Sequence, residues 1–137
     1  MSNCVFCRIV AGEVSSYKIY EDDSVLAFLD INPTTKGHTI VIPKKHYLDL
    51  PAAEETDLAA VLAVIKKIAP AVVAGSQAEG FNLGVNNGAV AGQVIEHLHF
   101  HLIPRKKNDG LTNWPSKVYQ PEEIAQYQEK IKQALVK

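Results

Sequence analysis

The sequence predicts an α+β fold, in which an antiparallel sheet of about five strands packs with one long helix and a C-terminal helix. Short runs rich in β-branched and aromatic residues alternate with turn-forming residues. One longer segment repeats apolar residues at helical spacing. Most neighbouring strand-like runs follow one another without an intervening helix, which favours hairpins over parallel βαβ units. With 137 residues, we expect one domain over residues 1–137.

Three strands are expected in the first third of the chain. Tyr17–Glu21 and Val25–Leu29 flank the triplet 22–24, Asp-Asp-Ser, whose side chains favour a turn by bonding their own backbone. These two runs therefore predict a hairpin. His38–Ile42 is the third strand, and it ends at Pro43.

The long helix is expected after an N-cap at Asp49 and to continue to Gly75. Pro51 suits the first turn of a helix, because its missing N–H has no intrahelical partner there. Pro70 should disturb the helix for the same reason. Apolar residues recur through this segment at helical spacing: Leu58, Val61, Leu62, Ile65, Ile68, Ala69 and Val72.

Two more strands and a helix complete the expected fold. Phe81–Val85 and Ile95–Ile103 are the strands, and the glycine-rich loop 86–92 joins them. Pro121 opens the last helix. Its apolar face is formed by Ile124, Tyr127, Ile131 and Leu135.

Composition narrows the classes of partner. Fourteen Lys and Arg against fifteen Asp and Glu give a net charge of -1, so no overall field attracts nucleic acid or an anionic membrane. We found no apolar stretch near the ~18 residues of a membrane span, and no basic region followed by an apolar core near Met1. We therefore expect a cytoplasmic protein that has neither nucleic acid nor membrane as its partner.

Three histidines alternate at positions 97, 99 and 101. In a strand, alternate side chains share one face, so the three imidazoles would face one way and Leu98, Phe100 and Leu102 the other. A histidine-rich solvent face on an edge strand is the alternative interpretation, and it is weaker because other polar residue types would serve there equally well. A single three-histidine metal site is difficult, because the outer two would lie ~13 Å apart.

The motif Cys4-Val5-Phe6-Cys7 is half of a zinc site, a redox pair or a coincidence. The redox interpretation is weaker, because no βαβ setting surrounds the motif. Zinc needs two more ligands, which His46 and one histidine of the alternating run can supply if the fold brings them together.

The loop from Asn86 to Gln93 leads directly into the histidine run. Its glycines allow backbone N–H groups to approach an anion, and its amide side chains add donors. The loop is thus a candidate phosphate site beside His99, although turn formation alone also explains its glycines.

The segment 92–105, Gly-Gln-Val-Ile-Glu-His-Leu-His-Phe-His-Leu-Ile-Pro-Arg, resembles the motif of the histidine triad (HIT) superfamily. The resemblance extends over nearly the whole chain: Cys4 to Gly12, Tyr20-Glu21-Asp22, Ala27 to Ile31, Lys36 to Thr39 and Val41 to His46 match small bacterial members in order and spacing. It implies a nucleotide-binding hydrolase or transferase that acts at the α-phosphate of a nucleotide, usually as a homodimer.

The resemblance also implies residue roles. His99 would be the nucleophile that forms a covalent nucleotidyl-histidine, and His101 and His38 would contact the phosphate oxygens and organise protonation. Asp30 would accept the ribose hydroxyls. The loop residues Asn86, Gly92 and Gln93 would donate hydrogen bonds to the phosphate. The base, which is expected to be a purine, would bind in an apolar slot formed by Val5, Phe6, Ile9, Phe28 and Ile31.

Bacterial relatives with an N-terminal cysteine pair bind zinc at positions that match Cys4, Cys7, His46 and His97. Four protein ligands would make that ion structural, with one ion per chain. Val94 departs from the Ser or Thr that many members carry after the Gln, so a hydroxyl donor is missing there.

The expected enzyme is therefore a HIT-family hydrolase of an AMP phosphoramidate, an adenylated amine or a diadenosine polyphosphate. A non-catalytic nucleotide-binding or interaction module with the same fold is the alternative. A thiol redox protein that uses Cys4 and Cys7 is a third possibility.

Overall fold

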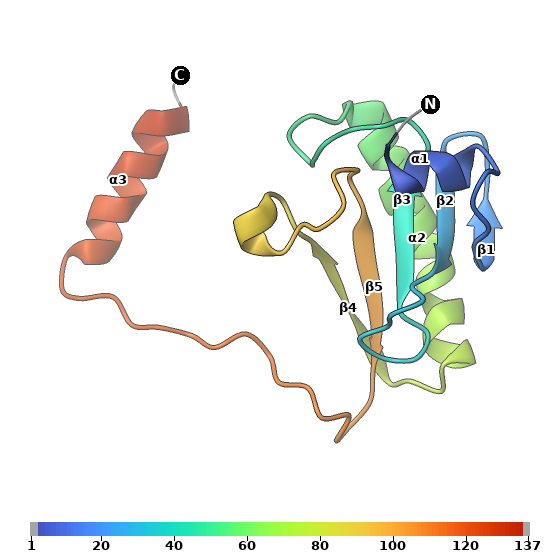
Figure 1. Ribbon diagram of the computed structural model, residues 1–137. Coiled ribbons are helices and arrows are strands. Elements are labelled where there is room, and N and C mark those ends of the chain that lie inside the picture. The colour runs from blue at the N-terminus through green and yellow to red at the C-terminus, as the bar shows by residue number, and fades with distance from the viewer. Residues whose placement is uncertain (1–2, 136–137) are drawn as a thin grey trace.

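The computed structural model describes residues 3–135 and shows an α+β fold built on one five-stranded antiparallel sheet, in the order β1-β2-β3-β5-β4 (Figure 1). This confirms the predicted fold class. The elements are α1 Val5–Val10, β1 Lys18–Glu21, β2 Val25–Leu29, β3 Thr39–Pro43, α2 Glu55–Gly75, β4 Gly80–Val85, the 3₁₀ turn η1 Ala89–Ala91, β5 Phe100–Arg105 and α3 Glu123–Leu135.

The two central strands alternate their side chains between two cores. Val25, Ala27 and Val41 pack with α2 on one face of the sheet. Leu26, Phe28, Ile40 and Ile42 pack with Phe6 and Ile9 of α1 on the other. This period of two is what a strand imposes, and it leaves β2 and β3 buried on both faces.

The predicted first hairpin is present as β1 and β2. Asp22 Oδ1 accepts hydrogen bonds from the backbone N–H groups of Ser24 and Val25, both at 2.8 Å. The side chain thus closes the turn that the sequence predicted. Strand β2 then pairs with β3 in antiparallel register, with Ala27 opposite Val41.

Helix α2 differs from the prediction at its start and in its middle. It begins at Glu55, with Glu54 as N-cap, whereas the side chain of Asp49 accepts a bond from Ala52 in a separate turn. The helix also continues through Pro70 without a break. Pro70 lies on the exposed face, where water can reach the carbonyl that a proline leaves unpaired.

By length and composition alone, α2 is the one helix of the described chain that can cross a membrane. Its position argues for a core helix instead. Six of its side chains are buried, and they pack with the sheet: Val61, Val64, Ile65, Ile68, Ala69 and Val72.

Strand β5 begins at Phe100 and not at Ile95, so the prediction of a strand from Ile95 was wrong for its first half. His97 and His99 precede the strand, and only His101 belongs to it. The reason is hydrogen bonding outside the sheet: the Leu98 N–H donates to the Tyr47 carbonyl, and the ring of His99 donates to the His97 carbonyl.

Helix α3 stands apart from the sheet at the end of an extended segment (Figure 1). None of its residues is buried. Its predicted apolar face is present and exposed, at Ile124, Tyr127, Ile131 and Leu135.

Candidate functional site

His99 is held with one ring nitrogen committed to the backbone. Its Nδ1 lies 2.7 Å from the His97 carbonyl oxygen. A carbonyl only accepts, so Nδ1 carries the proton and donates it. The Nε2 lone pair is then available for a substrate. The side chain is 7% exposed and borders a cavity, so this lone pair is shielded from bulk water.

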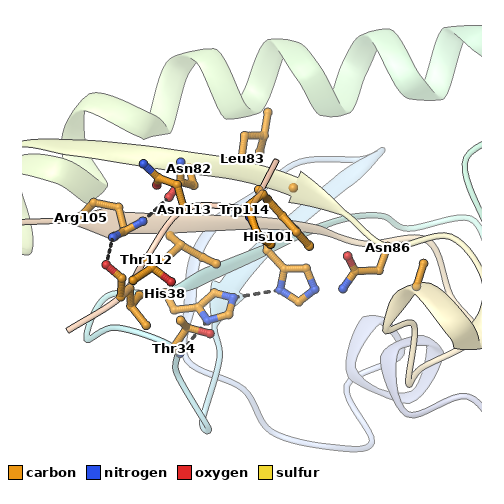
Figure 2. Close-up of a pocket in the computed structure, with 15 residues that line it drawn as sticks. Thr34, His38, Asn82, Leu83, Asn86, His101, Arg105, Thr112, Asn113 and Trp114 are labelled. Atoms are coloured by element: carbon orange, nitrogen blue, oxygen red, sulfur yellow. Dashed lines mark hydrogen bonds between the residues drawn. The ribbon is translucent and has the colours of Figure 1, made fainter. Parts of the chain in front are cut away.

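A second backbone group fixes the protons of His38 and His101. The Thr34 N–H donates to His38 Nδ1 at 3.0 Å, so the proton of neutral His38 is on Nε2. His38 Nε2 lies 2.9 Å from His101 Nδ1 and donates to it (Figure 2). His101 therefore carries its proton on Nε2, where it can donate to a substrate oxygen or nitrogen.

Both rings are neutral at pH 7. Burial, opposed in part by the Asp30 carboxylate, lowers the pKa of His38. Burial, with the neighbouring rings of His99 and His38, lowers the pKa of His101 to about 4. The donor chain from Thr34 through His38 to His101 thus keeps a single direction over the physiological range.

The low pKa of His101 predicts that acid weakens the fold. The pKa of His101 is about 4 in the folded chain and 6.5 in the unfolded chain. Between pH 4 and pH 6.5 the unfolded chain therefore binds more protons than the folded chain. The contribution of His101 to the free energy of unfolding is present above pH 6.5. It is lost as the pH falls toward 4, at about 1.4 kcal/mol per unit of pKa difference. Urea denaturation should show a flatter acid limb for His101→Gln than for wild type and the exposed control Lys132→Ala. If stability falls equally with acid in His101→Gln and in wild type, the prediction is wrong.

The first cavity, of about 490 Å³, lies between α1, β2 and the histidines. Asp30 and His99 border it, and one Asp30 oxygen accepts the Asn32 N–H at 2.8 Å. Nearly all substrate residues expected from the sequence line it: Val5, Phe6, Ile9, Phe28, Asp30, Ile31, Asn86, Gly92, His99 and His101. The structure thus brings together residues from four separate segments of the chain.

Gln93 is the exception. Its side-chain N–H groups donate to the carbonyls of Leu48 and Ile95, at 2.7 and 3.1 Å, and its oxygen accepts the Gly88 N–H at 2.9 Å. Both side-chain donors are therefore used within the protein. Gln93 shapes the loop, and in this conformation it offers no side-chain donor to a phosphate.

The loop itself needs glycine next to Gln93. Gly92 has φ +101°, and a Cβ there would lie 3.3 Å from the Asn86 amide nitrogen. Left-handed backbone and this close approach both favour glycine. As a result the Asn86 side chain stays beside His101 (Figure 2).

A second cavity, of about 610 Å³, lies on the other side of His101. Asn86 and His101 border both cavities. A group bound at His101 can therefore extend in both directions. The sequence did not predict a role for several residues of this cavity, among them Thr34, Asn82, Arg105 and Trp114 (Figure 2), or for Val14, Ser16, Ile40 and Ile95 in the first. Ile95 and Arg105 lie within the 92–105 motif but are not among its histidines, and no motif includes the others.

The four expected metal ligands meet in one cluster. Every ligand atom of Cys4, Cys7, His46 and His97 lies within 4.8 Å of the others. His97 Nδ1 is 3.4 Å from Cys4 Sγ, 3.5 Å from Cys7 Sγ and 3.2 Å from His46 Nδ1. A tetrahedral zinc ion requires edges of about 3.3 Å between nitrogens and about 3.6 Å between nitrogen and sulfur.

The proton of His97 also favours a metal. Its Nε2 donates to the Pro43 carbonyl at 2.9 Å, which leaves the Nδ1 lone pair directed into the cluster. The side chain is fully buried. Two cysteines and two histidines in this geometry match a closed Cys₂His₂ site.

A second group of potential ligands does not fit an ion. Asp30, His38 and His101 also place their ligand atoms within 4.8 Å of one another. However, the Thr34 N–H occupies His38 Nδ1 and keeps a proton on Nε2, so the nitrogen that faces the group has no lone pair for a metal.

Comparison with known proteins agrees with this geometry. The HIT domain family model matches residues 11–108. The adenosine 5′-monophosphoramidase of Schizosaccharomyces pombe is 40% identical over 131 residues, which are 94% of this chain and 96% of that protein. An adenylylsulfatase of Arabidopsis thaliana is 49% identical over 84% of this chain, and the match spans 57% of the plant protein.

Solved structures extend the comparison to the fold. A Streptococcus mutans protein superposes with a TM-score of 0.92 at 41% identity, over 98% of this chain and 87% of that one. A zinc-bound histidine triad family protein from Mycobacterium smegmatis has a TM-score of 0.76 at 36% identity, over 96% of this chain and 97% of that one.

Proposed function

Because the chain belongs to the histidine triad (HIT) family, we propose that it is a hydrolase that transfers a nucleoside monophosphate to His99 and then to water. The observation that carries the proposal is the state of the His99 ring. The residue borders a cavity and is 7% exposed, and its Nδ1 donates to the His97 carbonyl, which leaves the lone pair on Nε2. A neutral imidazole in this state is a competent nucleophile.

The reaction follows from the protons on the three rings. His99 Nε2 attacks the α-phosphorus, and the bond from phosphorus to the leaving group breaks with its electron pair. The His101 Nε2–H donates a hydrogen bond to the leaving group as negative charge develops on it, and a leaving group that must be protonated takes its proton from water. Water then attacks the phosphorus and loses a proton to the solvent, the bond from phosphorus to His99 Nε2 breaks, and neutral His99 and the nucleoside monophosphate are released. His38 keeps His101 in the tautomer that this cycle needs.

The names of two relatives support two candidate substrates. The yeast relative is named for hydrolysis of adenosine 5′-monophosphoramidate and the plant relative for adenylyl sulfate. Adenylated amines and diadenosine polyphosphates extend the panel. Val94 is 88% exposed at the cavity edge and has no hydroxyl to donate to the leaving group.

The test is a hydrolysis panel of these four substrate classes with wild type and His99→Ala. Mass spectrometry of quenched reactions separates the rival functions. An enzyme acquires a transient nucleotidyl adduct, a binding module retains intact nucleotide, and a thiol redox protein changes by the mass of two protons on oxidation.

Asp30 is proposed to bind the ribose. Its carboxylate lines the cavity and retains acceptor capacity beyond its bond from the Asn32 N–H. Losing one bond to a charged group costs ~1.5 to 3 kcal/mol, so Asp30→Ala should weaken AMP binding about 10- to 100-fold and abolish the preference for AMP over dAMP. Calorimetry measures both, with exposed Asp23→Ala as control. An unchanged preference would exclude this role.

We also propose that Cys4, Cys7, His46 and His97 hold one structural zinc ion per chain. The cluster geometry and the zinc-bound relative support this. Bound there, zinc would supply cross-linking only, because four protein ligands leave no position for an activated water. The cytoplasm, our proposed location, suits the site because thiols stay reduced there.

A homodimer is proposed to form at α2 and β4. Strand β4 is an edge of the sheet, with unpaired backbone groups on one side. Leu62, Phe81 and Leu83 are about half exposed and line an apolar groove between the two elements. Phe81→Glu should therefore give monomers in light scattering, whereas Ile19→Glu on the opposite edge should leave a dimer. A dimeric Phe81→Glu protein would refute this interface.

A further inference from the structure

Helix α1 belongs to two sites at once. Cys4 caps the helix through a bond from the Cys7 N–H at 3.3 Å, and both thiols belong to the metal cluster. Val5, Phe6 and Ile9 of the same helix line the cavity that borders His99. A wall of the proposed nucleotide site is thus built on the segment that supplies half of the metal ligands.

The helix is too short to hold its own position. It has six residues, and helices shorter than about 12 residues are marginal without tertiary contacts. Phe6 and Ile9 anchor it in the apolar cluster on β2 and β3, and such contacts are not directional. The ion pair of Arg8 reaches only Glu13 in the following turn. The metal cluster supplies a directional tie, from Cys4 and Cys7 to His46 and His97.

Phe6 connects the two sites physically. Its ring packs edge-on against His97 of the cluster, at 5.9 Å between centroids, and against His99, at 5.1 Å. It also packs edge-on against Phe28 at 5.5 Å. Rings at these distances have preferred relative orientations. A shift of α1 therefore moves the ring that borders both His99 and the apolar slot.

We infer that the metal ion positions α1 as the base-side wall of the nucleotide pocket, so that metal occupancy controls nucleotide affinity through Phe6. This inference rests on the proposed nucleotide hydrolase function and on the proposed zinc site. The histidine chain depends less on α1. The Thr34 N–H orients His38 and, through it, His101, and the His97 carbonyl orients the ring of His99. Loss of metal should therefore affect base binding before it affects phosphate chemistry.

Calorimetry with two probes tests this. AMP carries the base, and ribose 5-phosphate has the sugar and phosphate alone. Removing zinc with a chelator, checked by elemental analysis and by circular dichroism of the folded protein, should raise the Kd for AMP at least ~10-fold. The Kd for ribose 5-phosphate should change less than ~2-fold. KM for the nucleotide substrate should rise more than kcat falls.

Two zinc-loaded variants complete the test. Phe6→Leu keeps an apolar side chain but loses the ring, and it should weaken AMP binding selectively while zinc stays bound. Arg8→Ala, on the same helix, should leave zinc and both affinities unchanged. If chelation unfolds the protein, Phe6→Leu still tests the inference. Equal AMP affinity in this variant and in wild type would then overturn it.

Other outcomes separate the inference from its premises. Folded, zinc-free protein that binds AMP as tightly as the loaded form overturns the inference alone. Protein that takes up no zinc overturns the metal site and the inference with it, but leaves the His99 reaction standing. Protein that binds neither probe when loaded with zinc contradicts the proposed function itself.

Discussion

His99→Ala should lower turnover at least ~10³-fold while nucleotide affinity changes far less. The side chain supplies the attacking nitrogen, because the neighbouring rings of His38 and His101 use their lone pairs to accept the Thr34 N–H and the His38 N–H. Cavity-lining residues such as Phe28 and Asp30 remain in place in the variant, so the substrate should still bind. Steady-state kinetics with an AMP phosphoramidate measure the loss, and calorimetry measures the affinity.

The covalent intermediate gives this prediction a second readout. Acid-quenched wild-type reactions should contain AMP on a peptide that includes His99, and His99→Ala should contain none. Glu96→Ala, an exposed neighbour, controls for disturbance of the segment and should form the adduct. Near-wild-type turnover of His99→Ala, or an adduct on a different residue, would contradict the assignment.

The sequence predicted the strands better than it predicted their ends. Alternation and turn residues located the first hairpin, since Asp22 forms its turn by local bonds that depend on neighbouring residues only. Strand β5 was placed too early because the same alternation continues through His97 and His99, where the backbone bonds Tyr47 and a histidine ring instead of a strand. Helix α1 was missed because its six residues depend on tertiary contacts.

The chemistry of the site depended on information that the sequence does not contain. The alternating histidines indicated a shared face, but the tautomers are decided by the His97 carbonyl and the Thr34 N–H. The resemblance to the HIT family placed Gln93 at the phosphate. In the structure its amide is used by the carbonyls of Leu48 and Ile95, and a long-range contact of this kind has no local pattern.

The metal ligands could not be settled from the sequence pattern either. Spacing alone left zinc, redox and coincidence open for Cys4 and Cys7. The choice required His46 after β3 and His97 before β5 to reach the cysteines, and β3 and β5 are neighbours in the sheet. The strand order brings His46 and His97 together, and the packing of α1 on β2 and β3 brings the cysteines to them, with 3.3 Å between Cys7 Sγ and His46 Nδ1.

Cys4→Ser/Cys7→Ser should lower zinc content and melting temperature together. The proposed ion joins the start of α1, the loop after β3 and the segment before β5, so its loss removes a cross-link between distant parts of the chain. A decrease of roughly 10 °C or more corresponds to a few kcal/mol in a domain of this size. Elemental analysis and thermal denaturation measure the two effects on the same samples. His46→Gln, which removes a ligand outside α1, should show the same pair of losses.

The same variant separates a structural ion from a catalytic one. Soluble, folded Cys4→Ser/Cys7→Ser protein should keep measurable hydrolysis at saturating nucleotide, because His99 supplies the nucleophile and four protein ligands leave zinc no water to activate. Some rate should be lost, since His97 adjoins the segment that orients His99. A folded variant as inactive as His99→Ala would exclude a purely structural ion. Wild type purified without chelator that holds far less than one zinc per chain would exclude the site.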